Sequence, residues 1–215
     1  MKNVKHGMDR SWLVPVIALI IVLGMALFVR AQEQKTQEQK AQDQQQQMVE
    51  LWKKYAFPGE NHKHLAYFVG DWDSVQKIFP RDGSEPVMQK QQIHVESLFD
   101  GRFTKAHIKV EAPGNPNAPE GIVITGFDNY QGKVISVTFG NLSTDFSLLS
   151  GTLENNGKTR IDTGTRTDIF TGEEYKVRAV TTIIDQDSYK YEYYKSDAAG
   201  NERRTMEIMY TRRKG

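Results

Sequence analysis

The residues best suited to chemistry in this sequence are His94, Glu96 and His107. A two-residue turn at Asp100-Gly101 is favoured by that dipeptide and would place His94 opposite His107 and Glu96 opposite Lys105. Facing histidines can hold a metal or titrate near neutral pH, and a neighbouring carboxylate suits acid–base catalysis. The same register gathers apolar residues on the other face, which favours a solvated position for the histidines and an exposed Glu96–Lys105 ion pair.

Other motifs for metal or nucleophilic chemistry are absent from the sequence. His62 and His64 diverge by about 200° on a helix, so they do not ligate the same ion. The chain has no cysteine, which excludes disulfides and thiolate metal sites. It contains no H-E-x-x-H, no G-x-S-x-G and no Gly-rich phosphate loop. The sequence therefore predicts no cofactor and no metal site, with His94 and His107 as weak metal candidates only.

The elements that would position these residues are antiparallel strands. Short β-branched and aromatic runs separated by Gly, Asn, Asp and Pro clusters predict an all-β, up-and-down barrel of about eight to ten strands after a short helix at residues 60–69. Closure of such a meander removes the exposed edges. The predicted strands are 71–79, 87–98, 103–111, 121–128, 133–140, 144–153, 158–167, 174–185, 189–195 and 203–212.

Alternation along the last strands predicts one face turned toward a core or lumen. Barrels of this size are either filled by side chains or hold one small ligand, and a cavity of about 300 Å³ or more favours the second outcome. The aromatic and aliphatic candidates for lining a ligand site, or for filling a core, are Trp72, Tyr189, Tyr191, Tyr193, Met206, Ile208 and Tyr210.

The N-terminal part predicts export. Residues 12–29 carry no charge, and 18 residues at about 1.5 Å each span roughly 27 Å, close to a bilayer core. Basic residues within 1–11 keep the N-terminus cytoplasmic and place the domain outside, in the periplasm of a bacterium. The alternative is a signal peptide cleaved near Ala31. Residues 30–47 form a glutamine-rich spacer, and residues 48–213 form the barrel domain.

The charge balance bears on partners. Residues 1–31 hold four of the 28 basic and one of the 27 acidic residues, so the remainder has a net charge of −2. A net charge this close to zero does not indicate the basic surface that nucleic-acid binding needs. The predicted partners are the membrane, through residues 12–29, and a small apolar ligand; nothing identifies a protein partner.

The stretch "PGENHKHLAYFVGDW", from Pro58 to Trp72, resembles the opening motif of domain-of-unknown-function family 1579. Glu96 with Gly101-Arg102, the turn "TGFDNY" and the closing strands "FTGEEYKVRAVTTIIDQD" and "MEIMYTRR" resemble that family as well. The resemblance implies a lipocalin-like (calycin) barrel whose tryptophan packs across one end. It implies no activity and no catalytic residue. One departure is Thr138-Phe139-Gly140, where family members often carry Trp-x-Asp.

The sequence favours an envelope-anchored module that binds a small apolar ligand or is structural, rather than an enzyme. The alternative is a hydrolase-like enzyme that uses Glu96, His94 and His107 in the barrel lumen. The direction in which these three side chains point distinguishes the two.

Overall fold

The alternation of apolar and polar residues gives ten antiparallel strands. The computed structural model describes residues 13–168, 171–197 and 199–214. Its elements are α1 (Leu13–Ala56), α2 (Glu60–Tyr67), β1 (Gly70–Ile78), β2 (Val87–Leu98), β3 (Phe103–Val110), β4 (Glu120–Asp128), β5 (Lys133–Gly140), β6 (Ser147–Glu154), the 3₁₀ turn η1 (Asn155–Gly157), β7 (Thr159–Thr167), β8 (Glu174–Ile183), β9 (Ser188–Ser196) and β10 (Glu202–Arg212).

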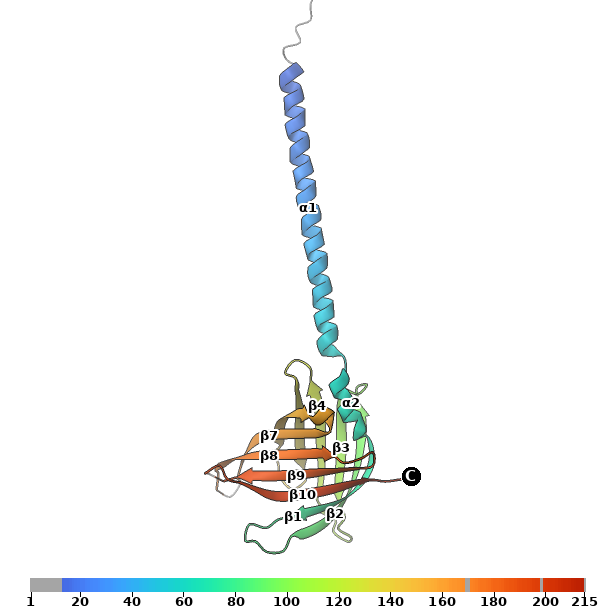
Figure 1. Cartoon of the computed structure of the whole chain (residues 1–215), viewed down its shortest axis with the longest axis vertical. Helices are drawn as coiled ribbons and strands as arrows, with labels where there is room; N and C mark the ends of the chain where they lie inside the picture. Colours follow the sequence, from blue (N-terminus) through green and yellow to red (C-terminus); the bar gives the residue numbers. More distant parts are fainter. Residues whose placement is uncertain (1–12, 169–170, 198, 215) are drawn as a thin grey trace, which may run out of the picture. The chain divides into compact units, whose positions relative to one another are not determined.

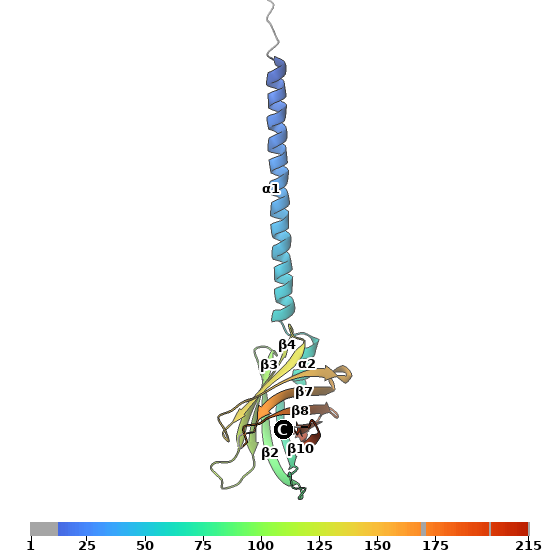
Figure 2. The ribbon, with the colours of Figure 1, turned by 90° about the vertical axis from the view of Figure 1, so that its left-hand side faces the viewer.

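The strands form one closed barrel in which each pairs with its neighbours in sequence, and β1 also pairs with β10. β7 and β8 lie side by side in both views of the ribbon (Figures 1 and 2), and β9 and β10 continue the same row in Figure 1. The predicted all-β, up-and-down meander is therefore confirmed, with ten strands. The largest difference in the strand bounds is at β6, which begins at Ser147 rather than 144.

The β2–β3 hairpin has the predicted register. His94 pairs with His107, Glu96 with Lys105 and Leu98 with Phe103. Asp100 and Gly101 have φ of 57° and 83°, and the Arg102 amide donates to the Phe99 carbonyl over 3.3 Å. A positive φ at both central residues is typical of the Asp-Gly turn that joins two twisted strands.

The chain divides into two units at Lys54 and Tyr55. α1 runs as one uninterrupted helix from Leu13 to Ala56, where the sequence predicts a span followed by a separate spacer. Between residues 25 and 57 the sequence has no proline or glycine and is rich in good helix formers. Pro58 then disfavours helix at the residue before it.

Among the residues that the structure describes, no helix is both long and apolar enough to cross a membrane. For the span predicted at residues 12–29, the structure describes the backbone from Leu13 on but only some of the side chains. Trp12 is not described, nor are the side chains of residues 13–22 and 26.

Inside the barrel, apolar and polar side chains occupy different sectors. The largest apolar cluster includes Trp72, Ile93 and Ile208, with Tyr189 and Tyr210. Next to it, inward side chains of β1 and β2 bond to one another: the Ser74 hydroxyl donates to Gln91 over 3.3 Å, and Gln91 donates to Gln76. Among the described residues that line the lumen cavity none belongs to β1, so its open space lies beside the other strands.

Candidate ligand-binding site

The barrel lumen holds a partly open cavity of about 220 Å³. Every strand except β1 contributes to its wall. An apolar cavity of ~150 Å³ takes one benzene molecule, so by proportion this one suits about nine heavy atoms. It falls short of the size of about 300 Å³ that would favour ligand binding over a filled barrel. The wall consists of Leu65, Phe68, Ile93, Val95, Thr104, Ala106, Ile108, Val123, Thr125, Ser136, Thr138, Leu149, Arg160, Asp162, Thr181, Tyr189, Tyr191, Met206, Ile208 and Tyr210.

One end of the cavity is covered by α2 and the residues after it, which supply Leu65 and Phe68 to the wall. The Trp72 indole is fully buried and donates to the Phe68 carbonyl over 2.8 Å. The Arg212 guanidinium lies 4.0 Å from the Trp72 ring centre and donates to the carbonyls of Tyr67 and Val69 over 2.8 and 2.9 Å. Trp72 and Arg212 therefore hold this cover in place by satisfying carbonyls at the end of α2.

The polar centre of the wall is an ion pair on β7, whose members are two residues apart and so point to the same side. Arg160 Nε donates to Asp162 Oδ2 over 2.8 Å, and the two side chains are 11% and 1% exposed. Burial raises the pKa of Asp162, and the nearby Arg160 guanidinium opposes that rise without cancelling it. A charged pair is thus held in an otherwise mainly apolar cavity wall.

Two further polar atoms of this region lack a partner among the described residues: Asp162 Oδ1 and Thr181 Oγ1. Asp162 Oδ1 lies against Gly151, where a Cβ would overlap it and would also lie 2.6 Å from the Ile161 carbonyl oxygen. Glycine at this strand position therefore leaves the room that the carboxylate occupies. Tyr191 lies close by; burial raises the pKa of its hydroxyl, and Tyr193, Tyr210 and Asp162 add to the rise.

His64 lies on α2 near the same pair. Its Nδ1–H donates to the Gly157 carbonyl over 2.7 Å, and its Nε2 is buried without a partner among the described residues. Burial, reinforced by the positive charge of Arg160, lowers the pKa of His64 to about 4. His62 is also buried; its Nδ1 accepts from the Gly59 amide over 3.0 Å, which fixes the start of α2. The two histidines therefore bond to separate backbone groups.

The residues that first suggested catalysis lie on the outside of the wall. His94 Nδ1 bonds to Asp71 over 2.8 Å, His107 bonds to Glu120, and Glu96 accepts from Lys105 over 2.7 Å. The side chains of His94, His107 and Glu96 are 62%, 33% and 43% exposed. The hydrolase alternative placed these three in the lumen, and that placement is wrong, because the inward positions of these strands hold Ile93, Val95, Ala106 and Ile108. Within the described part of the chain, no three acidic or histidine side chains gather as a metal site would need.

A family model described as "Protein of unknown function (DUF1579)" matches residues 57–212. The chain belongs to the DUF1579 family. No curated protein matches it. A solved structure of a protein with unknown function from the DUF3598 family of Nostoc punctiforme is similar over 73% of this chain and 100% of that chain, with 6% identity and a TM-score of 0.23. A TM-score this low carries no argument about fold or function.

Five of the seven side chains predicted to line a ligand site in this DUF1579 domain lie in the cavity wall. They are Tyr189, Tyr191, Met206, Ile208 and Tyr210. Trp72 and Tyr193 are not among the wall residues. Trp72 belongs to the cover, and Tyr193 packs against a second apolar cluster of Leu149, Val177 and Ala179. Burial raises the pKa of Tyr193 to about 12.

Sequence reasoning missed the polar part of this DUF1579 cavity, which consists of Arg160, Asp162 and Thr181 together with Thr104, Thr125, Ser136 and Thr138. The strand "TRIDTGTRT" has Ile161 as its one apolar residue among polar neighbours, so alternation alone would point Ile161 inward. The structure has the opposite orientation. The available signal was Gly151, because a glycine inside a strand often marks a close approach by another group.

Proposed function

We propose that this DUF1579 domain binds one small, largely apolar molecule inside a lipocalin-like barrel. The observation that carries the proposal is the interior cavity of about 220 Å³, roofed by Leu65 and Phe68 and walled mainly by aliphatic and aromatic side chains. Small-molecule sites are typically enclosed and apolar, with a few placed polar groups. Arg160 and Asp162 supply such groups here.

A purely structural role is the second candidate. Its support is the dense packing around Trp72, where Tyr189 lies 4.8 Å away edge-to-face and also stacks on Tyr210 at 4.1 Å. A filled barrel would retain no ligand. The hydrolase alternative has lost its motive, because its three residues face away from the cavity.

Native mass spectrometry of the full-length chain purified from its own host tests the proposal. We expect a non-covalent adduct in the wild type. Ala106→Leu, which adds bulk inside the cavity, should abolish the adduct, and so should Tyr191→Ala, which removes part of the wall. Lys105→Leu places the same leucine side chain on the outer face of the same strand and should keep the adduct. A wild-type protein that retains nothing, or an adduct indifferent to Ala106→Leu, would reject cavity binding.

We propose further that the domain is held outside the cytoplasmic membrane by residues 12–29. The support is the uncharged run and the basic residues that precede it. Carbonate washing of membranes should leave the chain in the pellet. A soluble product that begins at Gln32 would replace the anchor with a cleaved signal peptide.

A further inference from the structure

The Arg160 guanidinium has hydrogen-bonding capacity that the protein does not use. An arginine side chain offers five N–H donors in a planar fork. Among the described residues its one hydrogen bond is from Nε to Asp162, yet its side chain is only 11% exposed and lines the cavity. Donors left in such a place favour an acceptor brought by another molecule.

Asp162 fixes the direction of this fork. Its Oδ2 accepts from Nε alone among the described residues, and its Oδ1 is enclosed against Gly151. No second donor fits at that oxygen without movement. The carboxylate thus orients and neutralises the guanidinium and is itself closed to a ligand.

The charge of the pair decides which head group fits. Arg160 and Asp162 together are neutral, so an uncharged acceptor adds no net charge to the interior. A carboxylate or phosphate would bring a second negative charge beside a buried Asp162, and burying unpaired charge is costly. The site therefore favours a neutral oxygen over an anion.

The barrel order shows where the rest of the molecule lies. β2 is five strands away from β7 in the closed ring of ten, on the opposite side of the lumen. Its inward residues Ile93 and Val95, with Ala106 and Ile108 of β3, form an apolar wall that faces the ion pair across the cavity.

From these observations we infer that the cavity takes an uncharged molecule of about nine heavy atoms whose carbonyl oxygen accepts hydrogen bonds from Arg160 and whose apolar body packs against β2 and β3. This rests on the proposed cavity binding and adds the ligand class. Asp162 is the positioning residue.

Three probes of similar size separate the alternatives: acetophenone (neutral carbonyl), isopropylbenzene (no acceptor) and benzoate (anion), each of about nine heavy atoms. Isothermal titration calorimetry of the full-length chain should give binding of acetophenone and isopropylbenzene, with benzoate at least about ten-fold weaker than acetophenone. Arg160→Met with Asp162→Leu removes the pair without leaving a lone charge, and such replacements usually fold. This double variant should weaken acetophenone about ten-fold or more and should not weaken isopropylbenzene.

The matched control makes the same two changes on the outer face, Arg178→Met with Glu202→Leu, and should alter none of the three affinities. If no probe binds the wild type, cavity binding itself fails. If isopropylbenzene binds but the inner double variant leaves acetophenone unchanged, the inference is overturned and cavity binding stands. Tighter binding of benzoate than of acetophenone would overturn it in favour of an anion site.

Discussion

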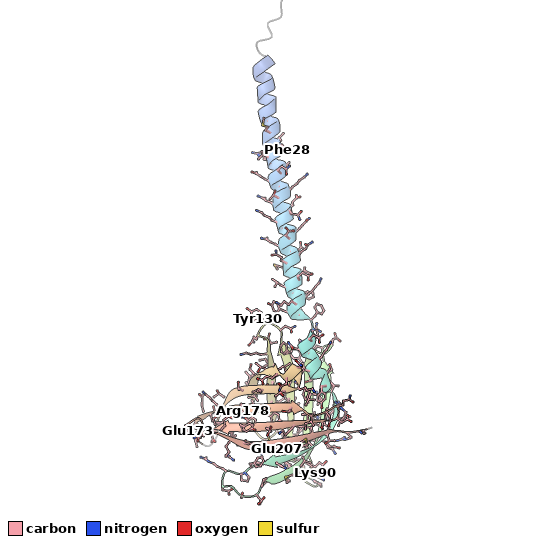
Figure 3. All side chains as sticks on the ribbon, in the orientation of Figure 1. Phe28, Lys90, Tyr130, Glu173, Arg178 and Glu207 are labelled. Carbon is pink, nitrogen blue, oxygen red and sulfur yellow. The ribbon has the colours of Figure 1, made fainter. Side chains whose placement is uncertain are left out.

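An arginine–carboxylate ion pair occurs on each side of the barrel wall, and the pKa of the carboxyl group shifts in opposite directions in the two pairs. Arg160–Asp162 lies inside, 11% and 1% exposed, and Arg178–Glu202 lies outside, 31% and 39% exposed (Figure 3 labels Arg178). Burial raises the pKa of Asp162 although Arg160 opposes the rise, whereas the hydrogen bonds from Arg178 lower the pKa of Glu202. Desolvation outweighs attraction inside, and attraction outweighs desolvation at the surface.

The largest expected effect comes from breaking the inner pair. Asp162→Leu leaves the Arg160 guanidinium buried without its counter-charge, and loss of one partner of a buried pair typically costs about 3–5 kcal/mol. Chemical denaturation of the full-length chain should show this loss in the free energy of unfolding.

Removing both partners provides the control for that experiment. Arg160→Met with Asp162→Leu should recover most of the stability, because apolar replacements of a whole buried pair are often neutral or stabilising. If the double variant is as unstable as the single one, the loss comes from packing, and the electrostatic contrast between the two faces fails.

The pH dependence of stability extends the comparison to His64, whose pKa of about 4 reflects burial and the positive charge of Arg160. The unfolded state takes up a proton near pH 6.5, well before the folded state does. The free energy of unfolding therefore has its full value, as far as His64 is concerned, above pH 6.5. As the pH falls from 6.5 toward 4, protonation of His64 in the unfolded state lowers this free energy by up to about 3 kcal/mol. His64→Asn keeps a donor for the Gly157 carbonyl and should flatten the fall in unfolding free energy over this window.

The exposed His94→Asn is the control for loss of a histidine as such. His62 is also buried, with a pKa lowered by desolvation and by Arg102, so some slope should persist in His64→Asn. A slope identical to that of the wild type would show that the buried imidazole of His64 takes up its proton without cost.

The sequence was informative about the fold because each strand and turn can be recognised from its own residues. Turn residues such as Asp100-Gly101 fix the register of a hairpin, and a period of two fixes which residues share a face. For β2 and β3 the apolar face was plain, and the register prediction is confirmed. The length of α1 was not foreseen, because a polar helix without an apolar stripe gives no periodic signal.

The site was predicted only in its apolar half. Tyr189, Tyr191 and Tyr210 alternate with polar residues, so their common face was evident. Arg160 and Asp162 also share a face, but no local rule says that two charged residues point into a barrel. Their position depends on pairing with β6 and β8, and on the space at Gly151, which are long-range properties.

A glycine substitution tests the close packing beside the inner ion pair rather than its charge. In Gly151→Ala the new methyl group would overlap Asp162 Oδ1 and approach the Ile161 carbonyl oxygen to 2.6 Å. Overpacking of this kind costs about 1–3 kcal/mol. Gly121→Ala is the control, since a Cβ there meets nothing nearer than the Phe139 carbonyl oxygen at 3.4 Å. Thermal unfolding should rank Gly151→Ala below Gly121→Ala, and equal midpoints would mean that β6 has room to shift.

The smallest effect is expected from the outer pair. Glu202→Gln removes one charge from a bond that solvent already screens, and Arg178 keeps its contact with the Tyr194 ring, 4.1 Å from the ring centre. Exposed ion pairs contribute about 0–1 kcal/mol. Denaturation at low salt and at about 1 M NaCl should show a small loss of unfolding free energy that disappears with salt, because the Debye length then shrinks to about 3 Å.

Asp162→Asn should lose stability almost equally at both salt concentrations, since solvent ions do not reach the lumen. An outer pair as costly to break as the inner one, or an inner loss that salt abolishes, would mean that the barrel wall does not separate two electrostatic environments.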